Sequence, residues 1–110
     1  MPPAIHFEAD ELAARRDRLR SLMLDQGMDG ILLFRQESMY YLTGYDTFGY
    51  VFFQCLYLGA DGAMTLVTRS PDAGVAAYTS VIDDIRTWVD GPDANPSLDV
   101  RAVLEEKGLL

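Results

Sequence analysis

The feature that most constrains the fold is a pair of apolar runs separated by a short glycine-containing segment. Residues 50–58 read YVFFQCLYL, residues 59–62 read GADG and residues 63–68 read AMTLVT. Aromatic and β-branched residues favour extended strands, and a Gly/Asp turn between two such runs is typical of a β-hairpin. The sequence therefore predicts an antiparallel hairpin over residues 50–68.

Three further elements are predicted before this hairpin. Residues 8–27 have early acidic residues, an apolar stripe at helical spacing and a terminal glycine, which predicts a helix. Residues 30–34, GILLF, are continuously apolar, as in a strand that is covered on both faces. The segment RQESMYYLTG predicts a short helix that ends near Gly44, where the chain needs a residue that tolerates positive φ. The stripe of the first helix consists of Leu12, Leu19, Leu22 and Met23.

The rest of the chain alternates in the same way. Ser70, Pro71 and Asp72 favour a helix start, and residues 81–89 form a further apolar strand pattern. Ser97 is a suitable N-cap for a last helix over residues 98–107, which Gly108 would end. Helices interleaved with strands in this order predict a three-layer α/β domain with a mixed β-sheet flanked by helices.

Charge and cysteine content exclude some classes of function. The net charge of −8 argues against nucleic acid and against anionic membrane surfaces as partners. Arginines cluster in RRDRLR, for which a solvated helix face is favoured over an anion site or a subunit contact. Cys55 is the sole cysteine, so no internal disulfide is possible, and a cytoplasmic location fits.

The residues show no catalytic constellation of their own. His6 is the sole histidine, and no metal-ligand motif or phosphate-binding loop occurs. Asp83 and Asp84 are adjacent in a predicted strand, so they would point to opposite faces and could not easily share a metal, and a position at a surface turn or edge is favoured for them. We therefore expect no catalytic residue, no metal site and no cofactor within these 110 residues.

One loop differs from the surrounding core pattern. In GYDTFGY, residues 44–50, four side chains lie between predicted elements, where binding residues concentrate. They are Tyr45, Asp46, Phe48 and Tyr50. We expect the three aromatic rings to form an exposed patch with Asp46 at its polar edge, and the neighbouring aromatic residues to belong to the core.

The order of these segments resembles the N-terminal domain of the creatinase, prolidase and aminopeptidase P family. The resemblance rests on RRDRLRSLMLDQGMDGILLF, then YYLTGY, then VIDDIRTWVD, and finally LDVRAVLEEKGLL. It covers nearly the whole chain and implies a fold of the ribonuclease H-like class. The resemblance also implies that residues 1–110 form such a domain, truncated before its last strand, with the catalytic domain absent.

The resemblance implies a function as well. The parent would be a dinuclear-metal hydrolase of C–N bonds in Xaa-Pro peptides, creatine-like amidines or ectoine-type rings, and a homodimer. Its two manganese, cobalt or zinc ions would lie in the C-terminal catalytic domain of the same chain. The residues Tyr45, Asp46, Phe48 and Tyr50 would help to wall the substrate pocket or form an interface. The alternatives are a hydrophobic seat for the catalytic domain, a stand-alone α/β ligand-binding module and a purely structural interaction domain.

Overall fold

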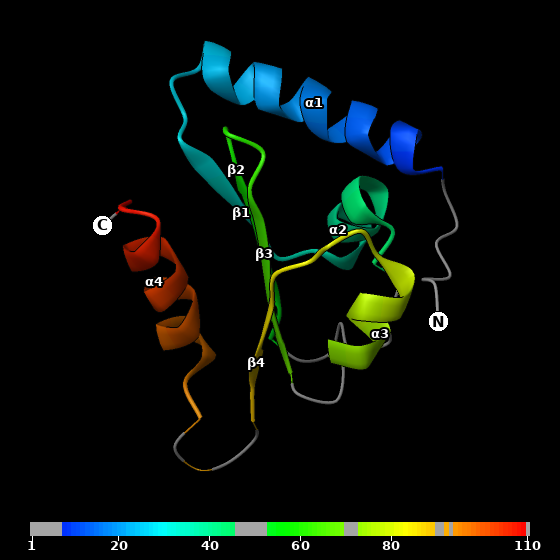
Figure 1. Cartoon of the computed structure of the whole chain (residues 1–110). Coiled ribbons are helices and arrows are strands. Elements are labelled where there is room, and N and C mark those ends of the chain that lie inside the picture. Colours follow the sequence, from blue (N-terminus) through cyan, green and yellow to red (C-terminus); the bar gives the residue numbers. More distant parts are fainter. Residues whose placement is uncertain (1–7, 46–52, 70–72, 90–91, 93, 110) are drawn as a thin grey trace.

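The computed structural model describes residues 8–45, 53–69, 73–89, 92 and 94–109. The elements follow one another in the predicted order of helices and strands (Figure 1). They are α1 (Ala9–Asp25), β1 (Gly30–Leu33), α2 (Gln36–Thr43), β2 (Cys55–Gly59), β3 (Met64–Arg69), α3 (Ala73–Thr79), β4 (Ile85–Trp88) and α4 (Pro96–Glu106).

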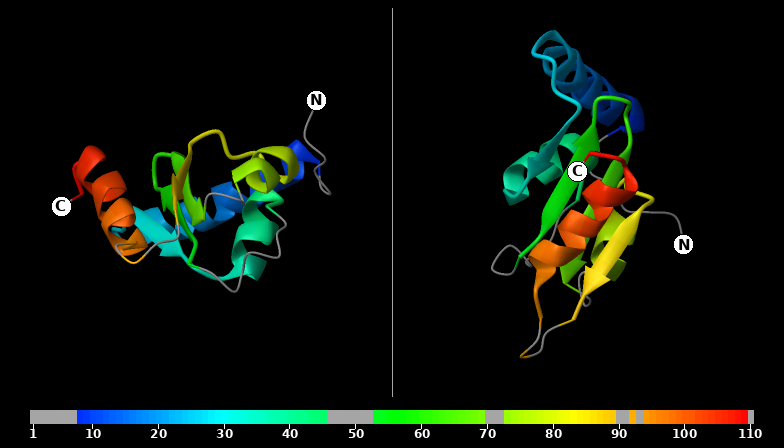
Figure 2. Two further views of the ribbon diagram at one scale, coloured as in Figure 1. Left: turned by 90° about the horizontal axis from the view of Figure 1, so that it is seen from below. Right: turned by 90° about the vertical axis from the view of Figure 1, so that its left-hand side faces the viewer.

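The sheet is mixed, as predicted. Its strands lie in the order β1-β2-β3-β4, with antiparallel pairing between β1 and β2 and between β2 and β3, and parallel pairing between β3 and β4. Helix α4 covers one face, while α2 and α3 cover the other and α1 lies across α2 and one end of the sheet (Figures 1 and 2). The three-layer α/β architecture is thereby confirmed.

The prediction that residues 30–34 form a strand covered on both faces is confirmed in part, since β1 is covered on both faces but is not fully buried. Strand β1 is at the margin of the sheet, and all four of its residues are only half-buried. Side chains on one face pack toward α1 and α2 and those on the other pack toward α4, so both faces need apolar residues.

Two strands or helices begin at other residues than the sequence predicts. Strand β2 begins at Cys55, and Phe53 and Gln54 precede it outside the strand, while residues 50–52 and 70–72 lie outside the described residues. Ser97 is not the N-cap of α4, because that helix begins at Pro96, directly after Asn95. Proline suits the first helical position, where its missing N–H has no intrahelical partner.

The first two helices end at glycines in the left-handed region, as predicted. The φ angle is 72° at Gly27 and 82° at Gly44. In the apolar stripe of α1, Leu12 and Met23 are buried, but Leu22 keeps 59% of its surface exposed. The apolar stripe is therefore only partly buried, and its exposed part lines a groove on the surface.

The prediction of a solvated arginine face is wrong for three of the four arginines in RRDRLR. Arg15 and Arg16 donate hydrogen bonds of 2.8 Å to the carbonyl oxygens of Tyr41 and Leu42, at the end of α2. Arg20 donates to the carbonyl oxygen of Ala60 in the β2–β3 turn at 3.0 Å. Carbonyls in the last turn of a helix lack intrahelical partners, so these arginines tie α1 to its neighbours. Arg18 remains exposed.

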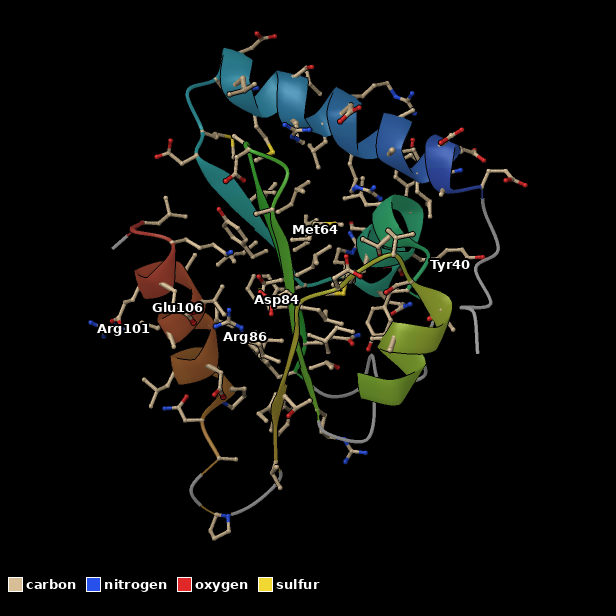
Figure 3. The ribbon with its side chains drawn as sticks, viewed as in Figure 1. Tyr40, Met64, Asp84, Arg86, Arg101 and Glu106 are labelled. Atoms are coloured by element: carbon tan, nitrogen blue, oxygen red, sulfur yellow. The ribbon has the colours of Figure 1, made fainter. Side chains whose placement is uncertain are left out.

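Asp84 belongs to a polar cluster that joins β4 to α4 (Figure 3). It precedes β4, and its Oδ2 accepts hydrogen bonds from Thr65 Oγ1 at 2.8 Å and Arg86 Nη2 at 3.2 Å. Arg86 also pairs with Glu106 of α4. The strand predicted over residues 81–89 is therefore shorter: β4 begins at Ile85, although the carbonyl oxygen of Asp84 still accepts the N–H of Leu66 in β3 at 2.9 Å.

Acid should remove the contribution of Asp84 to stability. Hydrogen bonds from Arg86 hold the pKa of the Asp84 carboxyl below its ordinary value of 3.8. A group whose pKa falls on folding stabilises the fold above its unfolded pKa and loses that effect as pH falls through the folded pKa. We expect Asp84→Asn to lower the urea midpoint at neutral pH, and the difference from wild type to shrink as the pH falls below 3.8.

The neighbouring exposed carboxylate supplies the control for this measurement. Asp83→Asn removes the same charge without breaking a bond to Thr65 or Arg86. Equal midpoints for the two variants at neutral pH would show that Asp84 contributes only its charge.

Candidate functional site

The candidate site lies at the end of the sheet where the chain enters and leaves residues 46–52. These residues, which include Asp46, Phe48 and Tyr50, lie outside the described part of the chain. The side chains on both flanks are described. Strands β1, β3 and β4 run in one direction, and their carboxyl ends lie at this end. In open α/β sheets, ligands bind at the carboxyl ends of the strands.

Tyr45, which directly precedes the segment, is a core residue. None of its surface is exposed, and its ring packs with Met39 and Leu56 in the main core cluster. Its hydroxyl donates to Gln54 Oε1 at 2.9 Å and lies 3.2 Å from Thr68 Oγ1. The predicted exposed patch therefore does not include Tyr45 in this domain.

The helix end explains why Tyr45 turns inward. Gly44 takes the left-handed conformation, and Thr43 Oγ1 accepts the N–H of Tyr45 at 3.2 Å. A residue that follows such a glycine commonly packs back on the last turns of its helix, here against Met39. The helix-ending glycine was the signal in the sequence that could have placed this ring in the core.

Two glutamines connect the flanks of the segment. Gln36 at the start of α2 donates from Nε2 to the carbonyl oxygen of Tyr45 at 2.8 Å. Gln54 donates from Nε2 to Gln36 Oε1 at 3.3 Å, and its own Oε1 accepts the Tyr45 hydroxyl. The chain is therefore fixed at residue 45 and again at residue 54. No local pattern in the sequence brings positions 36 and 54 together, so neither glutamine could be predicted to hold this segment.

The far flank is also held at Phe53. Trp88 at the end of β4 donates its indole N–H to the carbonyl oxygen of Phe53 at 3.0 Å. The Phe53 ring meets Phe34 edge to face, with a centroid separation of 6.0 Å. Phe34 is 54% exposed and Val89 is 70% exposed, so apolar surface lies at this end of the sheet.

A shallow hollow adjoins these side chains. It has a volume of about 380 Å³ and is lined by residues 34–37, including Arg35 and Glu37, whose charged groups lie 3.7 Å apart. Its chemistry suits contact with a substrate or another protein segment, since aromatic and paired polar groups bind without supplying a reacting group.

The described residues offer little for covalent or metal chemistry. Burial raises the pKa of the Cys55 thiol to about 11, which leaves it protonated and unreactive at neutral pH. In the described ranges, no three or more His, Cys, Asp or Glu side chains gather as metal ligands would. No helix in those ranges is long and apolar enough to span a bilayer.

Comparison with known proteins agrees with this architecture. The family described as the Creatinase/Prolidase N-terminal domain matches residues 15–109. The ectoine hydrolase of Halomonas elongata is 29% identical over 99 residues, which cover 84% of this chain and 25% of the hydrolase. The chain thus spans about a quarter of that curated relative.

Solved structures show the same fold. An Xaa-Pro aminopeptidase from Streptococcus pyogenes superposes with a TM-score of 0.73 at 20% identity, covering 93% of this chain and 71% of the other. A dipeptidase from Pyrococcus horikoshii OT3 gives a TM-score of 0.70 at 28% identity, covering 86% of this chain and 25% of the other. The creatinase/prolidase N-terminal domain of an X-Pro dipeptidase from Streptococcus pyogenes gives 0.68 at 22% identity, with coverages of 83% and 67%.

Proposed function

The chain belongs to the creatinase/prolidase N-terminal domain family, and from that premise we propose that it is the non-catalytic domain of a larger C–N bond hydrolase. The observation that carries the proposal is the family match over residues 15–109, together with relatives of which this chain spans only part. The partner in this proposal is a C-terminal catalytic domain of the same chain.

We assign the reacting groups to that second domain. The described residues do not fit a dinuclear metal centre, because they bring no three metal-ligating side chains together. The two divalent ions, manganese, cobalt or zinc, are therefore proposed to bind outside this domain, and no chemical step is assigned to the residues of this one. The reaction proposed for the whole protein is hydrolysis of an amide or amidine C–N bond, in a cytoplasmic homodimer.

The role proposed for this domain is to wall the substrate pocket. The support is that hydrogen bonds hold the chain on both sides of residues 46–52. Tyr45 is held before the segment, where its hydroxyl donates to Gln54, and Phe53 is held after it. Fixing both ends of a segment lowers the ordering cost of binding to it. Phe48 and Tyr50 are the candidate contacts to substrate, with Asp46 as the polar one, while Tyr45 is buried in the core.

The test uses a longer protein that carries this domain, assayed with Xaa-Pro dipeptides and with ectoine-type rings. We expect Phe48→Ala to lower kcat/KM by about tenfold or more, since losing ~1.4 kcal/mol of transition-state binding has that effect. Its thermal midpoint should stay close to that of wild type. The 110-residue chain assayed alone should show no turnover above background.

The control is Leu24→Ala, which removes an exposed apolar side chain on α1, outside the segment and its flanks, and should leave kcat/KM unchanged. If Phe48→Ala unfolds the domain and leaves the kinetics of the folded fraction unchanged, residue 48 is core and the pocket-wall role is wrong. A protein whose downstream sequence lacks a hydrolase domain would favour the alternative, a stand-alone binding module.

A further inference from the structure

We propose that the groove between α1, β1 and α2, here called the α1–α2 groove, binds a small carboxylic acid with an apolar body, whose carboxylate pairs with Arg18. The groove has a volume of about 470 Å³. Pockets for small ligands measure roughly 300–1,000 Å³, so the groove has the size for one small molecule. This proposal does not depend on the hydrolase assignment, and either of the two can fail alone.

Apolar side chains from all three elements line the groove. Leu22 of α1 is 59% exposed and Tyr41 of α2 is 49% exposed, so part of this apolar surface is in contact with water. Covering it with an apolar ligand is favourable, because burial removes apolar area from water. The aliphatic residues of the lining are Leu19, Leu22, Ile31, Leu33 and Leu42.

The α1 wall of the groove has a basic part and an apolar part. Its residues occupy positions i, i+3, i+4 and i+7 of the helix, which places them on one face. They are Arg15, Arg18, Leu19 and Leu22. The two arginines come first along the helix and the two leucines follow. A ligand on this wall therefore meets positive charge at one end and apolar surface at the other.

The charge of Arg15 is balanced within the domain. Its guanidinium pairs with Glu11 at 2.6 Å and donates a hydrogen bond of 2.8 Å to the carbonyl oxygen of Tyr41. The same group lies 4.4 Å from the centroid of the Tyr41 ring. These contacts hold the α1 wall against α2, and they occupy the groups that a ligand would need.

Arg18 differs, because its charge is not balanced. It is exposed, and in the described part of the chain it has no hydrogen bond or ion pair. The adjacent Asp17 pairs with Arg20 at 3.0 Å. Glu37, on the α2 side of the groove, lies 3.7 Å from Arg35. The α1–α2 groove therefore keeps one uncompensated positive charge.

This combination selects an apolar monoanion. A guanidinium presents its N–H donors in a planar fork that matches a carboxylate. Ser38 of α2 supplies a hydroxyl donor within the same groove. The net charge of −8 opposes any anion at long range, but such repulsion is largely screened beyond roughly 8 Å at physiological ionic strength. The local positive charge therefore decides the sign of the ligand.

Titration of the chain with 4-phenylbutyrate at neutral pH, followed by amide NMR shifts, tests the site. We expect saturable binding with a Kd on the order of 1 mM or tighter, as for a small ligand in an open groove. The shifts should concentrate on residues 15–22, 31–33 and 38–42. 4-Phenylbutanol, which has the same apolar body without the charge, should bind about tenfold more weakly, since a hydrogen bond between charged groups is lost. Acetate, which has the charge without the apolar body, should not bind measurably.

Two variants separate the charge from the apolar surface. Arg18→Gln should weaken binding of the acid by about tenfold and abolish its advantage over the alcohol, whereas Leu22→Ala should weaken both compounds alike. Both side chains are exposed, so circular dichroism should show folded variants. The matched controls are Arg101→Gln and Leu24→Ala, which change exposed side chains outside the groove and should leave the Kd unchanged.

Several results would overturn the proposal. They are the absence of saturable binding, equal affinity for the acid and the alcohol, and an Arg18→Gln variant that binds as wild type does. Shifts of the same amides that grow with protein concentration in the absence of ligand would assign the groove to a second copy of the chain instead. Loss of binding in a longer protein that carries this domain would assign it to residues that follow position 110.

Discussion

Replacing Tyr45 with alanine is expected to lower the free energy of unfolding by about 3–5 kcal/mol, the range for deleting a fully buried aromatic side chain. The ring has no exposed surface and packs with Met39 of α2 and Leu56 of the sheet in one core cluster. The cavity would also leave the Thr68 and Gln54 side chains without the Tyr45 hydroxyl. Urea unfolding followed by far-UV circular dichroism measures the change.

The phenylalanine variant separates the ring from its hydroxyl. Tyr45→Phe keeps the packing and removes the bond to Gln54 Oε1, so we expect a smaller loss of about 1–3 kcal/mol, the cost of one unsatisfied buried polar group. Combining it with Thr68→Val should give less than the sum of the two single effects, because both changes act on one contact. A Tyr45→Ala midpoint equal to that of wild type would contradict the core position of this ring.

Gly44→Val is expected to cost on the order of 1–3 kcal/mol through backbone strain alone, and to lose tertiary contacts in addition. Valine is a poor fit to the φ of 82° at this position. The turn cannot relax freely, since Arg16 donates to the carbonyl oxygen of Leu42 and Val81 donates to that of Thr43. Thermal unfolding should show the loss.

Gly27→Val is the matched control for this prediction. Gly27 has a φ of 72° and also ends a helix, but it is exposed, and a side chain there would meet nothing within 4 Å. We expect the midpoint to fall further for Gly44→Val than for Gly27→Val, because only the first turn is pinned by neighbouring elements. Equal shifts would mean that backbone strain accounts for the whole effect.

Gly44 and Tyr45 link the stability of the fold to the proposed function. Tyr45 and Gly44 stabilise the core and also fix where residues 46–52 begin. Substitutions there should alter both stability and any kinetics of a longer protein, whereas Phe48→Ala is expected to alter kinetics alone. A comparison of these variants at equal folded fraction would distinguish support of the segment from direct contact with substrate.

Local patterns in the sequence were sufficient for the element order, the hairpin and the helix ends. The run from Cys55 to Arg69 turns within a few residues, so its antiparallel pairing needs no information from elsewhere in the chain. Gly27 and Gly44 end their helices because the left-handed conformation is a property of single residues. The family resemblance, confirmed over residues 15–109, rested on the same order of segments.

Only the tertiary structure decided what depends on contacts between distant positions. An apolar run such as GILL is compatible with a central strand or an edge strand, and its place became clear only when β1 was found to pair with β2 alone among the described strands. Tyr45 was expected in an exposed loop patch, but its hydroxyl meets Gln54 and Thr68, which no periodicity brings together. Likewise Arg15, Arg16 and Arg20 found carbonyl oxygens 26 or more residues away. The physical reason is that torsion preferences and periodicity act over a few residues, whereas buried polar groups are satisfied by whichever partners the packed fold brings within reach.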